Sequence, residues 1–134
     1  MGVLLGIDHI AITVADMEAT HLFYDRLFGA EIRKDYAAGD RPLVRILAIG
    51  GGVTLSVHQA GNGLDLVARS PTPGSADLCF RWSGPVEAAI ALLEEHHIQI
   101  VEGPAPRETA DGMPGRSVYF RDPDGNLIEL MTSD

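Results

Sequence analysis

The stretch FRDPDGNLIELM, residues 120–131, has the pattern of a β-hairpin. Apolar residues dominate before and after its turn, as they do in strands that bury one face. The turn DPDGN contains Gly125, which supplies the positive φ that such turns need. Glu129 departs from this pattern, because it lies in a strand that is otherwise apolar. A buried carboxylate is costly unless it is paired or bound to a cation, so Glu129 is a candidate functional residue.

The hairpin closes the second of two similar halves of the chain. When the sequence is shifted over itself by 68 residues, IDHIAIT (7–13) falls on SADLCFR (75–81), and both alternate as strands do. Helix signals coincide at the same offset: Asp16 is a plausible N-cap, and Pro85 suits the first position of a helix. The sequence pattern of each half therefore predicts the order strand–helix–strand–strand–strand.

The remaining strands are predicted from apolar alternation between turn signals. They are AEIRKDY (30–36), LVRILAIG (43–50) and VTLSVHQ (53–59) in the first half, and IQIVE (98–102), RSVYFR (116–121) and LIELM (127–131) in the second. The segment GPAPRETADGMPG, between 98–102 and 116–121, is predicted to be a loop. The length of 134 residues suits one domain, with module one at about 5–60, a connector at 61–75 and module two at about 76–132.

Composition narrows the function classes. The net charge of −9 and the single lysine, Lys34, argue against nucleic acid or anionic lipid as a partner. No apolar run approaches the roughly 20 residues that span a bilayer, and the N-terminus lacks the features of a signal peptide. Cys79 is the only cysteine, which excludes an intrachain disulfide. A cytoplasmic protein is expected.

The chain resembles the vicinal oxygen chelate superfamily, the glyoxalase, bleomycin-resistance and extradiol-dioxygenase group. The likeness is carried by IDHIAITVADMEATHLFYDRLFGAEI (7–32), LSVHQAG (55–61), GSADLCF (74–80) and GRSVYFRDPDGNLIELM (115–131). It implies an α+β fold in which two βαβββ modules pair into a cupped mixed sheet around a divalent metal. It also implies a homodimer, whose chains in some members share a site.

The resemblance places metal ligands on the first and last strands of each module. Carried over to this chain, those positions are His9, Asp77 and Glu129, while Ser56 aligns with Glu129 in module one. His58 lies two residues beyond Ser56, faces the same side of its strand and is an alternative ligand. Many relatives have histidine where this chain has Asp77, so either Asp77 or the usual count of four ligands is in question.

Strand alternation gives an independent argument that the predicted ligands lie on one face of the sheet. If Ile10 and Ile12 face the helix, His9 faces the other side, and His58, Asp77 and Glu129 follow the same parity. Two imidazoles and a carboxylate suit Fe(II), and they also suit Mn, Ni or Zn. Nothing in the sequence separates these metals.

Each candidate also has a structural interpretation. A lone histidine at a strand edge is usually a hydrogen-bonded structural residue, and Asp77 could cap its strand or pair with Arg81.

Tyr119 lies on the same face of its strand as the predicted ligands, so it could donate a proton or a hydrogen bond at the site. Weaker candidates for substrate contact are Ser56, Ser117 and Arg121.

The sequence predicts a metal-dependent enzyme of the glyoxalase or dioxygenase type that acts on a small oxygenated substrate. The reaction class is open among lyase, isomerase and ring-cleaving dioxygenase, with Glu129 and Tyr119 as catalytic residues. The alternative is a non-catalytic protein of the bleomycin-resistance type that sequesters a small molecule or drug. The charge of −9 suits a cationic drug, but such proteins generally lack the ligand set.

Overall fold

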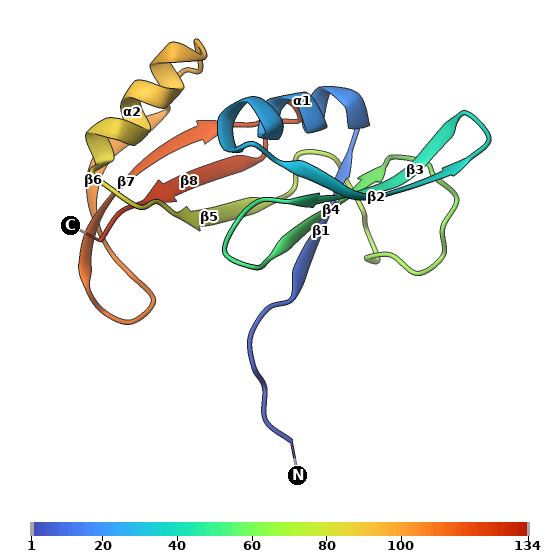
Figure 1. Ribbon diagram of the computed structural model, residues 1–134, viewed down its shortest axis with the longest axis horizontal. Helices are drawn as coiled ribbons and strands as arrows, with labels where there is room; N and C mark the ends of the chain where they lie inside the picture. Colours follow the sequence, from blue (N-terminus) through green and yellow to red (C-terminus); the bar gives the residue numbers. More distant parts are fainter. Residues whose placement is uncertain (1, 134) are drawn as a thin grey trace. The chain divides into compact units, whose positions relative to one another are not determined.

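The computed structural model describes residues 2–133, which fall into two compact units that divide between Pro73 and Gly74. Each unit has the predicted order strand–helix–strand–strand–strand, with one helix and a four-stranded mixed sheet (Figure 1). The α+β fold class is therefore confirmed. Among the described residues, neither helix is long and apolar enough to cross a membrane.

The first unit is built around a sheet with the strand order β1-β4-β3-β2, in which β1 and β4 run parallel and the other pairs are antiparallel. Its elements are β1 (His9–Val14), α1 (Met17–Phe28), β2 (Glu31–Ala38), β3 (Arg41–Ala48) and β4 (Thr54–Gln59). Helix α1 packs on β3 and β4 and covers one face of the sheet (Figure 1). The buried side chains beneath it include Val14, Tyr24, Leu47, Leu55 and Val57.

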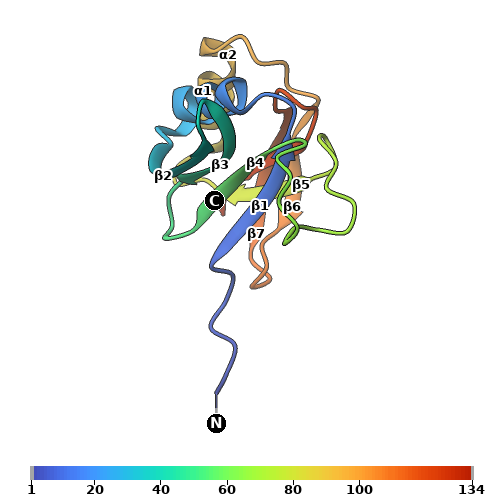
Figure 2. The same ribbon diagram turned by 90° about the vertical axis from the view of Figure 1, so that its right-hand side faces the viewer.

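The start of the first unit is apolar but exposed. Figure 2 shows the segment before β1 leading away from the sheet. Its large apolar side chains are all exposed: Val3, Leu4, Leu5 and Ile7.

The second unit repeats this plan with the strand order β5-β8-β7-β6. Its elements are β5 (Asp77–Arg81), α2 (Val86–Glu95), β6 (Glu102–Glu108), β7 (Pro114–Arg121) and β8 (Leu127–Met131). Strands β5 and β8 are parallel, and α2 packs on β7. The core again lies on the helix side of the sheet and includes Val86, Leu93, Val118, Phe120, Ile128 and Leu130.

The prediction for the third-last strand was wrong. The expected strand at 98–102 is not formed; β6 instead begins at Glu102 and runs through the segment that was predicted to be a loop. Pro104 and Pro106 made this segment read as a loop. Proline is tolerated in an edge strand, where its missing N–H faces solvent, and β6 is the edge of its sheet.

The DPDGN turn holds the closing hairpin through side-chain hydrogen bonds. Asp122 accepts hydrogen bonds from the backbone N–H groups of Asp124 and Asn126, both at 3.0 Å. The Asn126 amide donates to the second oxygen of Asp122 at 2.8 Å and accepts from the Ala76 N–H at 2.8 Å. Gly125 has φ +88°, as predicted for the turn. The turn is thereby tied to the start of β5.

The N-cap prediction for α1 is confirmed. Asp16 accepts hydrogen bonds from the N–H groups of Glu18 and Ala19, at 3.0 and 3.2 Å. Helix α2 has no side-chain cap, because Pro85 occupies the N-cap instead of the first helical position, and the helix begins one residue later than expected.

Replacing Asp16 by alanine is expected to lower the free energy of unfolding by about 1 kcal/mol, since two N–H groups at the helix start lose their acceptor. Urea titration followed by circular dichroism measures this change. Asp25→Ala is the matched control, because Asp25 is exposed on the same helix, and it is expected to change stability by less than about 0.5 kcal/mol. Equal losses in the two variants would contradict the capping role.

Candidate functional site

Glu129 lies in the middle of β8, a central strand of the second sheet. Cys79 of β5 is directly opposite it on one side, and Tyr119 of β7 is opposite it on the other. Its neighbours along the chain, Ile128 and Leu130, are buried on the helix side. Strand alternation therefore places Glu129 on the face away from α2, as expected.

A chain of hydrogen bonds leads from the edge strand to Tyr119, the neighbour of Glu129. Arg107 of β6 donates to the Tyr119 hydroxyl oxygen at 2.8 Å and to the Glu102 carboxylate at 3.0 Å. The guanidinium carbon also lies 5.3 Å from the centre of the Tyr119 ring. Tyr119 and Glu129 are opposite each other on β7 and β8, and because the Tyr119 oxygen accepts from Arg107, its own proton is available to a neighbouring acceptor.

The electrostatics follow from this arrangement. Burial raises the pKa of Tyr119; the hydrogen bond from Arg107 opposes the rise, and Glu129 adds to it. Burial and then the charge of Glu129 raise the pKa of the Cys79 thiol to about 11. Near neutral pH, Cys79 is therefore a protonated thiol and a hydrogen-bond donor, not a nucleophile.

One carboxylate oxygen of Glu129 makes no hydrogen bond to the described residues. Oε2 is buried and has no hydrogen-bond partner among the described residues. A buried polar atom without a partner is costly and calls for an explanation. An oxygen in this position can accept a proton from a bound molecule or bind a cation.

The other residues predicted for the second unit are arranged around this centre. Asp77 is exposed and lies opposite Leu127, two positions along from the partner of Glu129. Ser117 is fully buried on β7, and its hydroxyl has no partner among the described residues. Arg121 is exposed and donates to the carbonyl of Gly125 at 3.3 Å, so it braces the turn.

In the first unit, the structure does not bring His9 and His58 together. They share a face, but His9 pairs with Thr54 while His58 pairs with Thr13, so they are four residues apart along the strands, roughly 13 Å. The exposed His9 ring instead contacts Asp8, with 2.7 Å between Nδ1 and Oδ1.

The register of β1 and β4 also identifies the equivalent of Glu129 in the first unit. Ala11 pairs with Ser56 in the way that Cys79 pairs with Glu129. The alignment of Ser56 with Glu129 is therefore matched by the register, and the first unit has a buried serine where the second has the carboxylate.

Arg107, Glu102 and Cys79 were missed as site residues by sequence reasoning. Arg107 lies in the segment that was predicted to be a loop, so the face that its side chain takes was not considered, and Glu102 was the last residue of the strand expected at 98–102.

A metal was expected at the site, and the donor chemistry can be compared with that expectation. The unpartnered Oε2 of Glu129 and the exposed imidazole of His9 are suitable donor types for a divalent transition metal. Among the described residues, however, no three His, Cys, Asp or Glu side chains are grouped so that they could hold an ion. In the second unit, Glu129 is the predicted ligand that has an unpartnered oxygen.

The family model of the Glyoxalase/Bleomycin resistance protein/Dioxygenase superfamily matches residues 6–130. This chain belongs to that superfamily. The family resemblance seen in the sequence is thereby confirmed. The family includes enzymes, and its name also covers a class of drug-resistance proteins.

The chain is similar to two named proteins over most of its length. It is 40% identical over 124 residues to virulence protein STM3117 of Salmonella typhimurium, which covers 92% of this chain and 81% of that protein. It is 41% identical over 125 residues to the glyoxalase domain-containing protein RDO1 of Mycosarcoma maydis, and the match covers 93% of this chain and 66% of that protein. Among solved structures, the integron cassette protein VCH_CASS1 of V. cholerae superposes with a TM-score of 0.85 at 36% identity, covering 100% of this chain and 99% of the other.

Proposed function

We propose that this chain is an enzyme of the glyoxalase or dioxygenase type that acts on a small oxygenated substrate, with Glu129 as its central carboxylate. The observation that carries this proposal is the buried Oε2 of Glu129, which has no partner among the described residues. Family membership supports it, because glyoxalases and dioxygenases are enzymes.

The roles of the surrounding residues follow from their contacts. Tyr119 would donate a hydrogen bond towards Glu129, whose unpartnered Oε2 would take a proton from the substrate. Arg107 fixes the direction in which the Tyr119 hydroxyl points, because it occupies one lone pair of that oxygen. Glu102 in turn holds the guanidinium of Arg107.

A divalent metal is part of the proposal. His9 and Glu129 would be ligands and Asp77 would be a third, with Fe, Mn, Ni or Zn as the ion. His58 lies roughly 13 Å from His9 along the strands and would not join them. A bound metal would act as a Lewis acid that stabilises negative charge developing on a substrate oxygen.

The alternative is a non-catalytic protein that binds a small molecule or drug. It is favoured by the lack of a three-donor group among the described residues. The net charge of −9 further suits a cationic ligand.

Metal content separates the two proposals. We expect protein purified from metal-replete cells to contain near-stoichiometric metal by elemental analysis, and Glu129→Gln to bind Mn(II) at least about tenfold more weakly. Even the loss of an outer partner of a metal ligand typically costs tenfold or more. Electron paramagnetic resonance of free Mn(II) gives the affinities.

Glu87→Gln is the matched control, because it makes the same change at a carboxylate of the second unit that is paired with Arg116. It is expected to leave Mn(II) affinity unchanged. Metal-free wild-type protein that also fails to bind added Mn(II) would contradict the enzyme proposal and support the binding protein. Sedimentation of the same samples tests the expected homodimer.

A further inference from the structure

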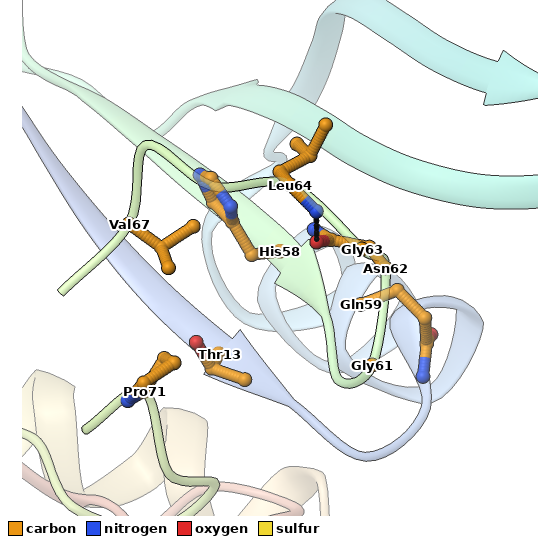
Figure 3. Close-up of a pocket in the computed structure, with 9 residues that line it drawn as sticks. All are labelled: Thr13, His58, Gln59, Gly61, Asn62, Gly63, Leu64, Val67 and Pro71. Atoms are coloured by element: carbon orange, nitrogen blue, oxygen red, sulfur yellow. Dashed lines mark hydrogen bonds between the residues drawn. The ribbon is translucent and has the colours of Figure 1, made fainter. Parts of the chain in front are cut away.

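A cavity of about 130 Å³ lies in the first unit, at the ends of β1 and β4 (Figure 3). The loop that follows β4 forms its other wall and contributes Leu64, Val67 and Pro71. For comparison, an apolar protein cavity of roughly 150 Å³ holds a benzene molecule. The space therefore suits a ligand of about the size of one ring.

Two polar side chains in the wall are already committed to the protein backbone. Asn62 donates to the carbonyl of Leu43 at 3.0 Å and accepts from the N–H of Leu64 at 2.9 Å. Gln59 makes two backbone hydrogen bonds around the start of α1, at 2.9 and 2.7 Å. The Asn62 bonds hold the loop and the Gln59 bonds hold the start of α1, so each amide already uses its oxygen and one of its N–H groups.

Two other polar side chains of the wall, Thr13 and His58, are neighbours on adjacent strands. Thr13 of β1 pairs with His58 of β4, and both line the cavity (Figure 3). The Nδ1 atom of His58 is buried and has no partner among the described residues. Burial also lowers the pKa of His58.

The wall has no strongly charged group. None of the described residues that line the cavity is Asp, Glu, Lys or Arg. An ionic ligand would lose hydration without gaining a counter-charge. A neutral ring would cover the half-exposed side chains of Leu64 and Val67 and offer a hydrogen-bonding group to His58.

We infer that this cavity is a binding site for a neutral, ring-sized molecule that carries a hydroxyl or N–H group, with phenol as the simplest example. The hydroxyl would satisfy Nδ1 of His58, and the ring would lie against the loop. This site belongs to the first unit alone, so the inference holds whether or not Glu129 binds a metal.

Nuclear magnetic resonance of the full chain at pH 7 tests the inference with three probes of similar size. Phenol is expected to give saturable shifts of the His58 ring signals. Toluene, which lacks the hydroxyl, is expected to bind roughly threefold to tenfold more weakly. Benzoate, which is anionic, is expected to give no saturable shift.

Variants locate the binding. His58→Phe keeps a ring in place but removes the nitrogen, so phenol should lose its advantage over toluene. Val67→Trp fills the cavity from the loop and leaves β4 unchanged, so it should abolish binding of both. His96→Phe, at the end of α2 in the second unit, is the matched control and should leave phenol binding unchanged.

Three results would each overturn the inference: no saturable shift with phenol, benzoate binding as tight as phenol binding, or unchanged phenol binding in Val67→Trp. An unchanged preference for phenol over toluene in His58→Phe would do so as well, because it would remove His58 from the site.

Discussion

At pH 8, iodoacetamide is expected to alkylate Cys79 at least about ten times more slowly than an exposed thiol of ordinary pKa. Only the thiolate reacts, and a pKa of about 11 in place of 9.0 reduces the thiolate fraction roughly a hundredfold. A thiolate of higher pKa is also intrinsically more nucleophilic, and this offsets up to about tenfold of the loss in rate. The Cys79 residue is open to solvent even though the atoms around its thiol partly desolvate it, so access of the reagent does not explain a slow rate.

The pH dependence and a single variant identify the cause. The alkylation rate is expected to rise about tenfold per pH unit up to about pH 11, where the thiol ionises. Glu129→Gln should speed the reaction severalfold at pH 8, since it removes the negative charge that opposes ionisation. Burial, the larger cause, remains in that variant, so the rate should not reach that of an ordinary thiol.

Mass spectrometry of quenched samples measures these rates. The control thiol is Ser133→Cys in a Cys79→Ser background, because Ser133 is exposed near the end of the chain. A Cys79 rate within about threefold of the control at pH 8 would contradict the contact between Cys79 and Glu129. It would also weaken the assignment of Glu129 as the central carboxylate.

Most of the fold was predictable because its signals are local. The period of two in the strands, the Asp16 cap and the Gly125 turn each specify the backbone within a few residues, and the half-chain repeat supplied the order. Strand β6 was not predicted, because whether a strand lies at the edge of a sheet depends on the arrangement of all the strands. Pro104 and Pro106 argue against a strand only if the strand is central.

The site was predictable only in part. Alternation placed Glu129 and Tyr119 on one face, because parity is visible in the sequence. The register between strands cannot be read from the sequence. Only the observed pairing shows that His58 lies beside Thr13 and that Cys79 lies beside Glu129. Arg107 depends on both, since it reaches Tyr119 across a pairing of β6 and β7 with an irregular register.

Asn126→Ala is expected to lower the free energy of unfolding by about 3 kcal/mol. Asn126 and Asp122 are both buried. The substitution leaves the Ala76 N–H without its acceptor and removes the amide donor from one oxygen of Asp122. A buried group that loses its hydrogen-bond partner costs about 1–3 kcal/mol, and more if it is charged.

Urea unfolding of the variant beside wild-type protein measures this loss. Arg121→Ala is the matched control on the same hairpin, because Arg121 is exposed and its one hydrogen bond, to the Gly125 carbonyl, is 3.3 Å long. It should change stability by less than about 0.5 kcal/mol. A loss below about 1 kcal/mol in Asn126→Ala would show that backbone pairing of β5 and β8 alone sets the start of LIELM. A loss near 3 kcal/mol would mean that the turn fixes where that strand begins, and hence which face Glu129 occupies.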